Sequence, residues 1–136
     1  MHAEPSAESC PVGYKVSGFR GQPRLVEVRK GRSAKHTYDY YTPGWRLLPD
    51  IEWAGLPKSA DGVKPPACLD EMLKPSSVLT DGFPHARTDW CVVGDRMLFG
   101  ELTFFNDAGF GPMDERTAQT LGSLIDLDFA YDNRRL

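Results

Sequence analysis

Two pairs of short strand-like segments constrain this chain more than any other feature. In the first pair, residues 14–19 (YKVSGF) and 24–29 (RLVEVR) alternate between polar and apolar side chains, and the break at 20–23 holds a glycine and a proline. A period of two is the pattern of a strand with one buried face, and a short glycine-containing break joins such strands into a hairpin. The sequence therefore predicts a β-hairpin over residues 14–29.

A second hairpin is predicted further along the chain. Residues 87–93 (RTDWCVV) and 96–105 (RMLFGELTFF) are rich in strand-forming side chains, and the Gly94-Asp95 turn separates them. Antiparallel pairing across so short a turn brings polar residues of both strands close together. Residues 37–41 (TYDYY) are rich in aromatic side chains and predict one more short strand.

The segments between and after these strands predict two helices and a long loop. Residues 69–73 predict the start of a helix, and Pro75 either ends this helix or kinks it, with 76–79 as the continuation, because proline removes a backbone hydrogen bond. Residues 114–124 predict a second helix that begins at an aspartate. The segment 49–66 is rich in proline and glycine and predicts a long surface loop.

One domain of the α+β class is the expected fold. A chain of 136 residues fits one domain, and the order of the elements favours a mostly antiparallel sheet with flanking helices packed on one side. We expect the domain to span residues 12–127. The small and polar residues at 1–11 predict a disordered lead-in, and residues 128–136 predict a fraying tail.

Charge and composition exclude several classes of partner. Sixteen Lys and Arg residues against nineteen Asp and Glu residues give a net charge of −3, so no basic excess favours nucleic acid. No apolar run is long enough for a membrane span, and the N-terminus lacks the charged-then-apolar order of a secretory signal. Three widely spaced cysteines, Cys10, Cys68 and Cys91, predict reduced thiols. Together these features predict a cytoplasmic protein.

Asp89 and Glu101 are the strongest candidates for a functional site. They lie at about the same level on the two strands of the second predicted hairpin. If both side chains leave one face, carboxylates about 4 Å apart repel by about 1 kcal/mol in water and by about 4 kcal/mol at an effective dielectric of about 20. A hard divalent cation such as Mg²⁺ removes this penalty. Arg87 shares a face with Asp89 and is suited to steady a phosphate or an oxyanion.

More ordinary explanations exist for these residues and for others. A solvated sheet face with an ion pair at its rim is the commoner setting for Arg, Asp and Glu on a hairpin. His36 and His85 are expected to be structural histidines. Five aromatic side chains are expected to pack in the core or anchor loops. Their functional alternative is stacking on a sugar or a base. These are Tyr38, Tyr40, Tyr41, Trp45 and Trp53.

Two blocks of sequence resemble the C-terminal core of the TupA-like ATP-grasp family: residues 81–90 (DGFPHARTDW) and 97–110 (MLFGELTFFNDAGF). This family is linked to the synthesis of bacterial surface polymers such as teichuronopeptide and capsular polysaccharide. Further pieces match in the same order, among them 19–23 (FRGQP) and 69–72 (LDEM). The likeness extends over residues 12–127.

The resemblance implies a chemistry and assigns roles to residues. ATP-grasp enzymes use ATP to activate a carboxylate as an acyl phosphate, which an amine then attacks. In this scheme Asp89 and Glu101 match the Mg²⁺ ligands, and Arg87 matches the arginine that stabilises charge on the transferring phosphoryl group or the tetrahedral intermediate. Lys15 is implied as a nucleotide contact. Thr103 stands where many of these ligases place an asparagine as a third metal-binding oxygen.

The resemblance also implies a partner. Complete ATP-grasp enzymes carry an earlier subdomain with phosphate-covering lysines and a glycine-rich loop, which residues 1–13 do not supply. We therefore expect a partial ATP-grasp protein that becomes a carboxylate–amine ligase when another polypeptide provides the N-terminal half. The alternative is a truncated, non-catalytic remnant that acts as a binding or interaction module and exposes an apolar face where the missing half would dock.

Overall fold

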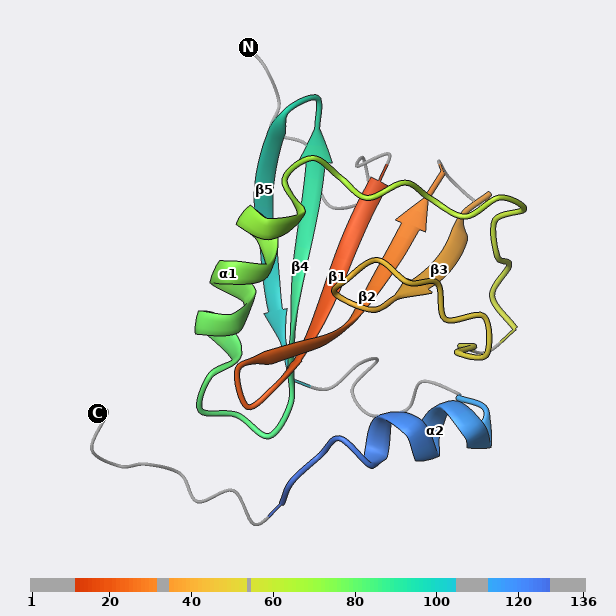
Figure 1. Ribbon diagram of the computed structural model, residues 1–136. Coiled ribbons are helices and arrows are strands. Elements are labelled where there is room, and N and C mark those ends of the chain that lie inside the picture. The colour runs from red at the N-terminus through yellow and green to blue at the C-terminus, as the bar shows by residue number, and fades with distance from the viewer. Residues whose placement is uncertain (1–11, 32–34, 54, 105–112, 128–136) are drawn as a thin grey trace.

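The structure, a computed structural model, describes residues 12–31, 35–53, 55–104 and 113–127. All pairs of neighbouring strands in its single sheet are antiparallel, and the strand order is β3-β2-β1-β4-β5 (Figure 1). The predicted α+β class with a mostly antiparallel sheet is confirmed. Along the chain the elements are β1 Val12–Phe19, β2 Gln22–Lys30, β3 Thr37–Tyr41, α1 Leu69–Thr80, β4 Ala86–Val93, β5 Arg96–Thr103 and α2 Glu115–Gly122.

Both predicted hairpins form. β1 and β2 meet at a tight turn in which Arg20 and Gly21 have positive φ angles of 53° and 78°. β4 and β5 are joined by Gly94 and Asp95, and β3 has the predicted bounds. Alternation therefore identified β1 and β2, and strand-forming or aromatic side chains identified β3, β4 and β5.

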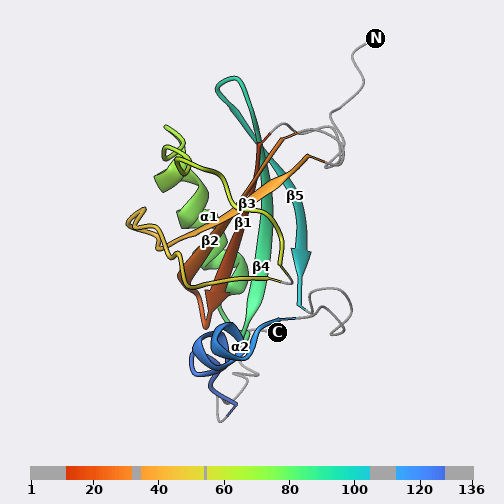
Figure 2. The ribbon, with the colours of Figure 1, turned by 90° about the vertical axis from the view of Figure 1, so that its right-hand side faces the viewer.

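The main core lies between one face of the sheet and α1. Val16, Val26 and Val28 are fully buried on this face, together with Met72 of the helix. Figure 2 shows α1 lying against this side of the strands. Burial of each such side chain stabilises the fold by about 1.5–3 kcal/mol, so this layer fixes the positions of β1, β2 and β4.

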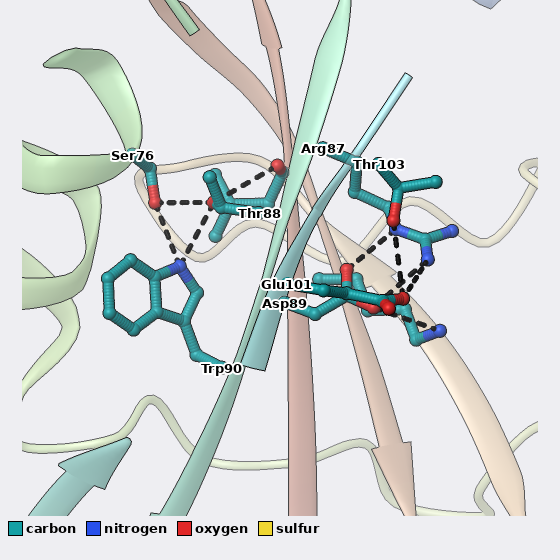
Figure 3. Close-up of polar contacts among 9 residues, drawn as sticks. Ser76, Arg87, Thr88, Asp89, Trp90, Glu101 and Thr103 are labelled. Carbon is teal, nitrogen blue, oxygen red and sulfur yellow. Dashed lines mark hydrogen bonds and ion pairs between the residues drawn. The ribbon is translucent and has the colours of Figure 1, made fainter. Parts of the chain in front are cut away.

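A buried hydroxyl network ties α1 to β4. Thr88 Oγ1 donates to Ser76 Oγ at 2.7 Å, and Trp90 Nε1 lies 3.0 Å from both hydroxyl oxygens. Ser76 Oγ in turn donates to the Met72 carbonyl oxygen at 2.7 Å. Figure 3 shows this network on one side of β4. Because each of these polar groups has a partner, the network orients the helix without an unsatisfied buried group.

Pro75 does not end α1, which runs through it from Leu69 to Thr80. The proline cannot donate to the carbonyl four residues earlier, but that residue, Glu71, is exposed, so water can satisfy its oxygen. The last turn of the helix sits close on β1 at Gly18, where a Cβ atom would lie 2.2 Å from Thr80 Oγ1. Glycine is therefore required at this contact.

α2 lies across one end of the sheet and joins the other core (Figure 1). Its Leu121 packs with Leu25, Tyr40 and Ile51, and Leu25 and Tyr40 leave the face opposite to α1. The prediction that the helices pack on one side of the sheet is therefore wrong. Sequence periodicity shows that a helix has an apolar stripe but not which face of a sheet receives it.

One polar contact caps α2 and another attaches it to the rest of the fold. Asp114 caps the helix as its carboxylate accepts a hydrogen bond from Thr117 N at 2.9 Å, which confirms the predicted start of this helix. Thr117 Oγ1 in turn accepts a hydrogen bond from Glu52 N at 2.9 Å. The helix is thus attached to the proline-rich loop that follows β3.

The remaining sequence predictions have mixed outcomes. Cys68 is a free thiol as predicted, but Cys91 is disulfide-bonded, so the prediction of reduced thiols is wrong for Cys91. No helix in the described part of the chain is long and apolar enough to cross a membrane. The predicted lead-in at 1–11 and the predicted tail at 128–136 lie outside the described residues.

The hydroxyl network predicts the effect of one substitution. Ser76→Ala removes the oxygen that Thr88 and Trp90 share and is expected to lower the free energy of unfolding by about 1–3 kcal/mol. Urea denaturation measures this change. Val78→Ala, on the exposed side of the same helix, is the matched control and should change it by no more than about 0.5 kcal/mol. Equal effects of the two substitutions would contradict a stabilising role for the network.

Candidate functional site

A bulge in β5 places Glu101 beside Asp89. The pairs next to the turn keep one register, which then shifts by one residue so that Asp89 lies opposite Glu101 and Gly100 is the extra residue. In the unshifted register Glu101 would lie opposite Thr88, on the face that α1 covers. A Cβ atom on Gly100 would lie 3.3 Å from the Asp89 carbonyl oxygen, so glycine suits this close approach.

The register also lines up one polar row across all five strands. The row runs from Tyr40 on β3 through Glu27 on β2 and Lys15 on β1 to Asp89 on β4 and Glu101 on β5. Each member lies directly opposite the next, so all five leave the sheet on the face away from α1. The expectation that Asp89 and Glu101 share a face is therefore met.

Arg87 holds the two carboxylates together. Its Nε donates to Asp89 Oδ1 at 2.7 Å and its Nη2 to Asp89 Oδ2 at 3.0 Å, and Nη2 lies 3.8 Å from Glu101 Oε1. Lys15 Nζ is 3.5 Å from Asp89 Oδ2. Figure 3 shows Arg87, Asp89, Glu101 and Thr103 gathered on the side of β4 opposite the hydroxyl network. Two cations thus balance two anions at this place.

The donor set suits a hard cation such as Mg²⁺. Two carboxylates from adjacent strands supply oxygen ligands, and Thr103 Oγ1 lies 3.2 Å from Glu101 Oε1, where it donates a hydrogen bond. The side chain of Glu101 is 64% exposed and open to an incoming ion, whereas that of Asp89 is 16% exposed. Within the described residues no group of three or more His, Cys, Asp or Glu side chains is placed to hold a metal ion.

A cavity of about 460 Å³ opens beside the acidic pair. Lys15, Asp89 and Glu101 form one side of it, and Arg29 of β2 adds a further cation. Leu98 and Phe99 are among its apolar lining residues. Small-molecule sites commonly combine such apolar walls with a few charged groups.

Glu27 is a site residue that the sequence predictions missed. It lies in the polar row opposite Lys15, and burial raises the pKa of its carboxyl, although Lys15 and Arg87 oppose this shift. The alternation of residues 24–29 contained the signal, since a glutamate between two inward-facing valines must point to the other face. No sequence rule shows that this other face is also partly buried.

The five aromatic residues considered as possible stacking groups pack in the two hydrophobic cores. Tyr41 and Trp45 belong to the core beneath α1, with ring centroids 4.4 Å apart in a stacked arrangement. Tyr38, Tyr40 and Trp53 belong to the core that α2 joins. Core packing is therefore confirmed for all five.

The fold and the site together define a class of protein. An antiparallel sheet with one packed face and one face of paired carboxylates, arginine and lysine is suited to a metal-bound, phosphate-bearing ligand. A family model described as TupA-like ATPgrasp matches residues 3–126, which is nearly the whole chain. The chain belongs to this family, which confirms the resemblance in the sequence. No curated protein and no solved structure matches the chain.

The Arg87 contacts predict a large effect of removing the guanidinium. Arg87→Leu leaves two neighbouring carboxylates short of positive charge, and because the Arg87 side chain is only 11% exposed, the free energy of unfolding should fall by about 3 kcal/mol. Arg116→Leu breaks the exposed ion pair with Asp50 and should cost less than about 1 kcal/mol. Denaturation at low and high salt checks both values. A small, salt-sensitive effect for Arg87→Leu would mean that the pair is merely a surface contact.

The buried Glu27 predicts a pH-dependent stability. Because its pKa is raised in the folded protein, the folded state binds the proton more tightly than the unfolded chain, and stability is lost as pH rises from the ordinary glutamate pKa through the raised one. Glu27→Gln removes this loss, so its Tm should exceed that of the wild type at about pH 8 and approach it at about pH 4. Glu71→Gln, at an exposed position of α1, is the control. A Tm difference that is equal at both pH values would be inconsistent with burial of the charge.

Proposed function

We propose that this chain takes part in ATP- and Mg²⁺-dependent carboxylate–amine ligation during the synthesis of a bacterial surface polysaccharide. The observation that carries the proposal is the direct pairing of Asp89 with Glu101 on one sheet face, bridged by Arg87. Membership of the TupA-like ATP-grasp family supports the reaction class. The polymer context rests on the family resemblance.

Asp89, Glu101 and Thr103 are the proposed oxygen donors to the metal. When bound there, Mg²⁺ would offset the negative charge of the nucleotide phosphates. Asp89 and Glu101 are cross-strand neighbours, so their Cβ atoms are expected to lie about 4.5–5.5 Å apart. Thr103 orients the Glu101 carboxylate through its hydrogen bond, although a hydroxyl is a weaker ligand than an amide oxygen.

Arg87 and Lys15 are proposed to contact the phosphates. Both lie within 4 Å of the acidic pair, and both are held there by Asp89. A guanidinium that carboxylates hold in place can bind a phosphoryl oxygen with little reorganisation. Arg87 is thus the proposed catalytic residue, and Lys15 is the proposed cofactor-binding partner that faces the cavity of about 460 Å³.

The cavity also supports a role for a second polypeptide. Within the described residues its lining comes from strands β1, β2, β4 and β5 of the single sheet, so that one layer of the molecule forms it. We propose that another polypeptide, bearing phosphate-covering lysines, closes over this face to complete the ligase. Use of ATP places the proposed activity in the cytoplasm, where a disulfide such as that of Cys91 is unusual.

Calorimetry with Mg²⁺ and ATP tests the proposal. The wild-type chain should bind Mg²⁺-ATP, and Asp89→Asn combined with Glu101→Gln should weaken binding by at least about tenfold, which corresponds to about 1.4 kcal/mol. Asp70→Asn combined with Glu71→Gln makes the same change of charge on the exposed surface of α1 and should leave affinity unchanged.

Two outcomes would contradict the proposal. Equal affinity of the two double variants would remove Asp89 and Glu101 from the metal site. A wild-type chain that sediments as a monomer and shows no affinity for Mg²⁺-ATP would instead favour the non-catalytic binding module. The Arg87–Asp89 ion pair, which balances charge without a metal, is the observation on which that alternative rests.

A further inference from the structure

A second cavity, of about 310 Å³, lies between the polar face of the sheet and α2. Its size is at the lower end of the range for small-molecule sites. Lys15 and Arg87 line this cavity, and both also contact Asp89, so the cavity adjoins the proposed phosphate site. Its apolar wall comprises Phe19, Leu25, Tyr40, Trp53, Leu121 and Ile125.

Glu27 is the one acidic side chain among the described residues that line this cavity, and it lies directly opposite Lys15. The charges of Lys15, Arg87 and Arg29 oppose the rise of its pKa that burial causes, but no hydrogen bond or ion pair within 4.0 Å reaches Glu27 among the described residues, and Lys15 and Arg87 pair with Asp89 instead. Burial lowers the pKa of His85, which also lines the cavity, and so disfavours a positive charge on its ring. A partly buried carboxyl group without a hydrogen-bond donor favours a ligand that donates hydrogen bonds, such as an amine.

Tyr40 provides a second indication of the same kind. Its hydroxyl is buried and has no hydrogen-bond partner in the described part of the chain, although the residue is only 2% exposed. Tyr40 lies directly opposite Glu27 in the polar row, and its ring forms part of the cavity wall. An unpaired buried hydroxyl costs stability, which suggests that it serves a purpose other than folding.

We propose that this cavity binds the amine substrate: a primary amine on an apolar or aromatic body, with its ammonium group at Glu27 and its body against the wall that α2 closes. This inference rests on the proposed ligase function and adds the chemical class of the acceptor. The arrangement is consistent with that chemistry, since Lys15 and Arg87 connect the amine cavity with the site where the activated carboxylate would form.

Benzylamine is the probe, and the full chain is titrated in the absence of nucleotide. Benzyl alcohol and benzoate, which have the same ring with a neutral and an anionic head, are the matched controls. Benzylamine should shift the NMR signals of Trp53 and Leu121 and bind at least about tenfold more tightly than either control. Glu27→Gln should abolish this preference, whereas Glu71→Gln on exposed α1 should retain it.

Tyr40→Phe provides an independent measurement. Loss of an unpaired buried hydroxyl should raise the Tm, while loss of a hydrogen-bond acceptor should weaken benzylamine binding by about two- to tenfold. A purely structural tyrosine would change stability without changing the preference among the three probes. This variant also keeps the test decisive if Glu27→Gln does not fold.

Several results would overturn the inference. Tighter binding of benzoate would assign the cavity to the carboxylate substrate, and equal binding of all three probes would reduce it to an apolar pocket. Absence of any shift at Trp53 and Leu121 would remove the site altogether. If Mg²⁺-ATP still binds in a manner that depends on Asp89 and Glu101, each of these results rejects the amine site alone. Loss of that dependence with benzylamine binding intact rejects only the ligase function.

Discussion

The bulge at Gly100 is the constraint on which the polar face depends. A regular hairpin from the Gly94-Asp95 turn would set Glu101 opposite Thr88 and bury a carboxylate against α1, which costs several kcal/mol for an unpaired charge. The one-residue shift moves Glu101 to the other face, where Arg87 meets it. The bulge therefore decides whether Glu101 is buried against α1 or forms one half of an acidic pair.

One face of β4 packs against α1, and the other face carries charged side chains of the candidate site. On one face, Thr88 and Trp90 are locked to α1 through Ser76 by hydrogen bonds of 2.7–3.0 Å. On the other face, Arg87 and Asp89 occupy the intervening positions of the same strand. Because side chains alternate along a strand, rigid packing beneath the sheet fixes the backbone from which the charged side chains project.

Sequence patterns predicted the strands because alternation in the first hairpin and strand-forming side chains in the other strands identify extended segments directly. They placed Arg87, Asp89 and Glu101 on one hairpin and identified the family. They left the register of β4 and β5 uncertain, because a bulge depends on how two backbones pair and a single glycine such as Gly100 does not predict one. They missed Glu27 and misplaced α2 for a related reason. The burial of Glu27 and the position of α2 both depend on which segments cover the second face of the sheet. Contacts between segments far apart in the sequence decide this.

The bulge has a further consequence for the open borders of the sheet. The outer border of β3 is covered, since Tyr38 N donates to Pro57 O at 2.8 Å and Leu48 N donates to Tyr40 O at 2.7 Å. β5 is the other edge strand of the sheet, and no strand formed by the described residues pairs with its outer side. Its irregular backbone and the exposed charges of Arg96 and Glu101 disfavour pairing with a strand of another molecule. The same irregularity that pairs two carboxylates thus also protects the molecule against edge-to-edge aggregation.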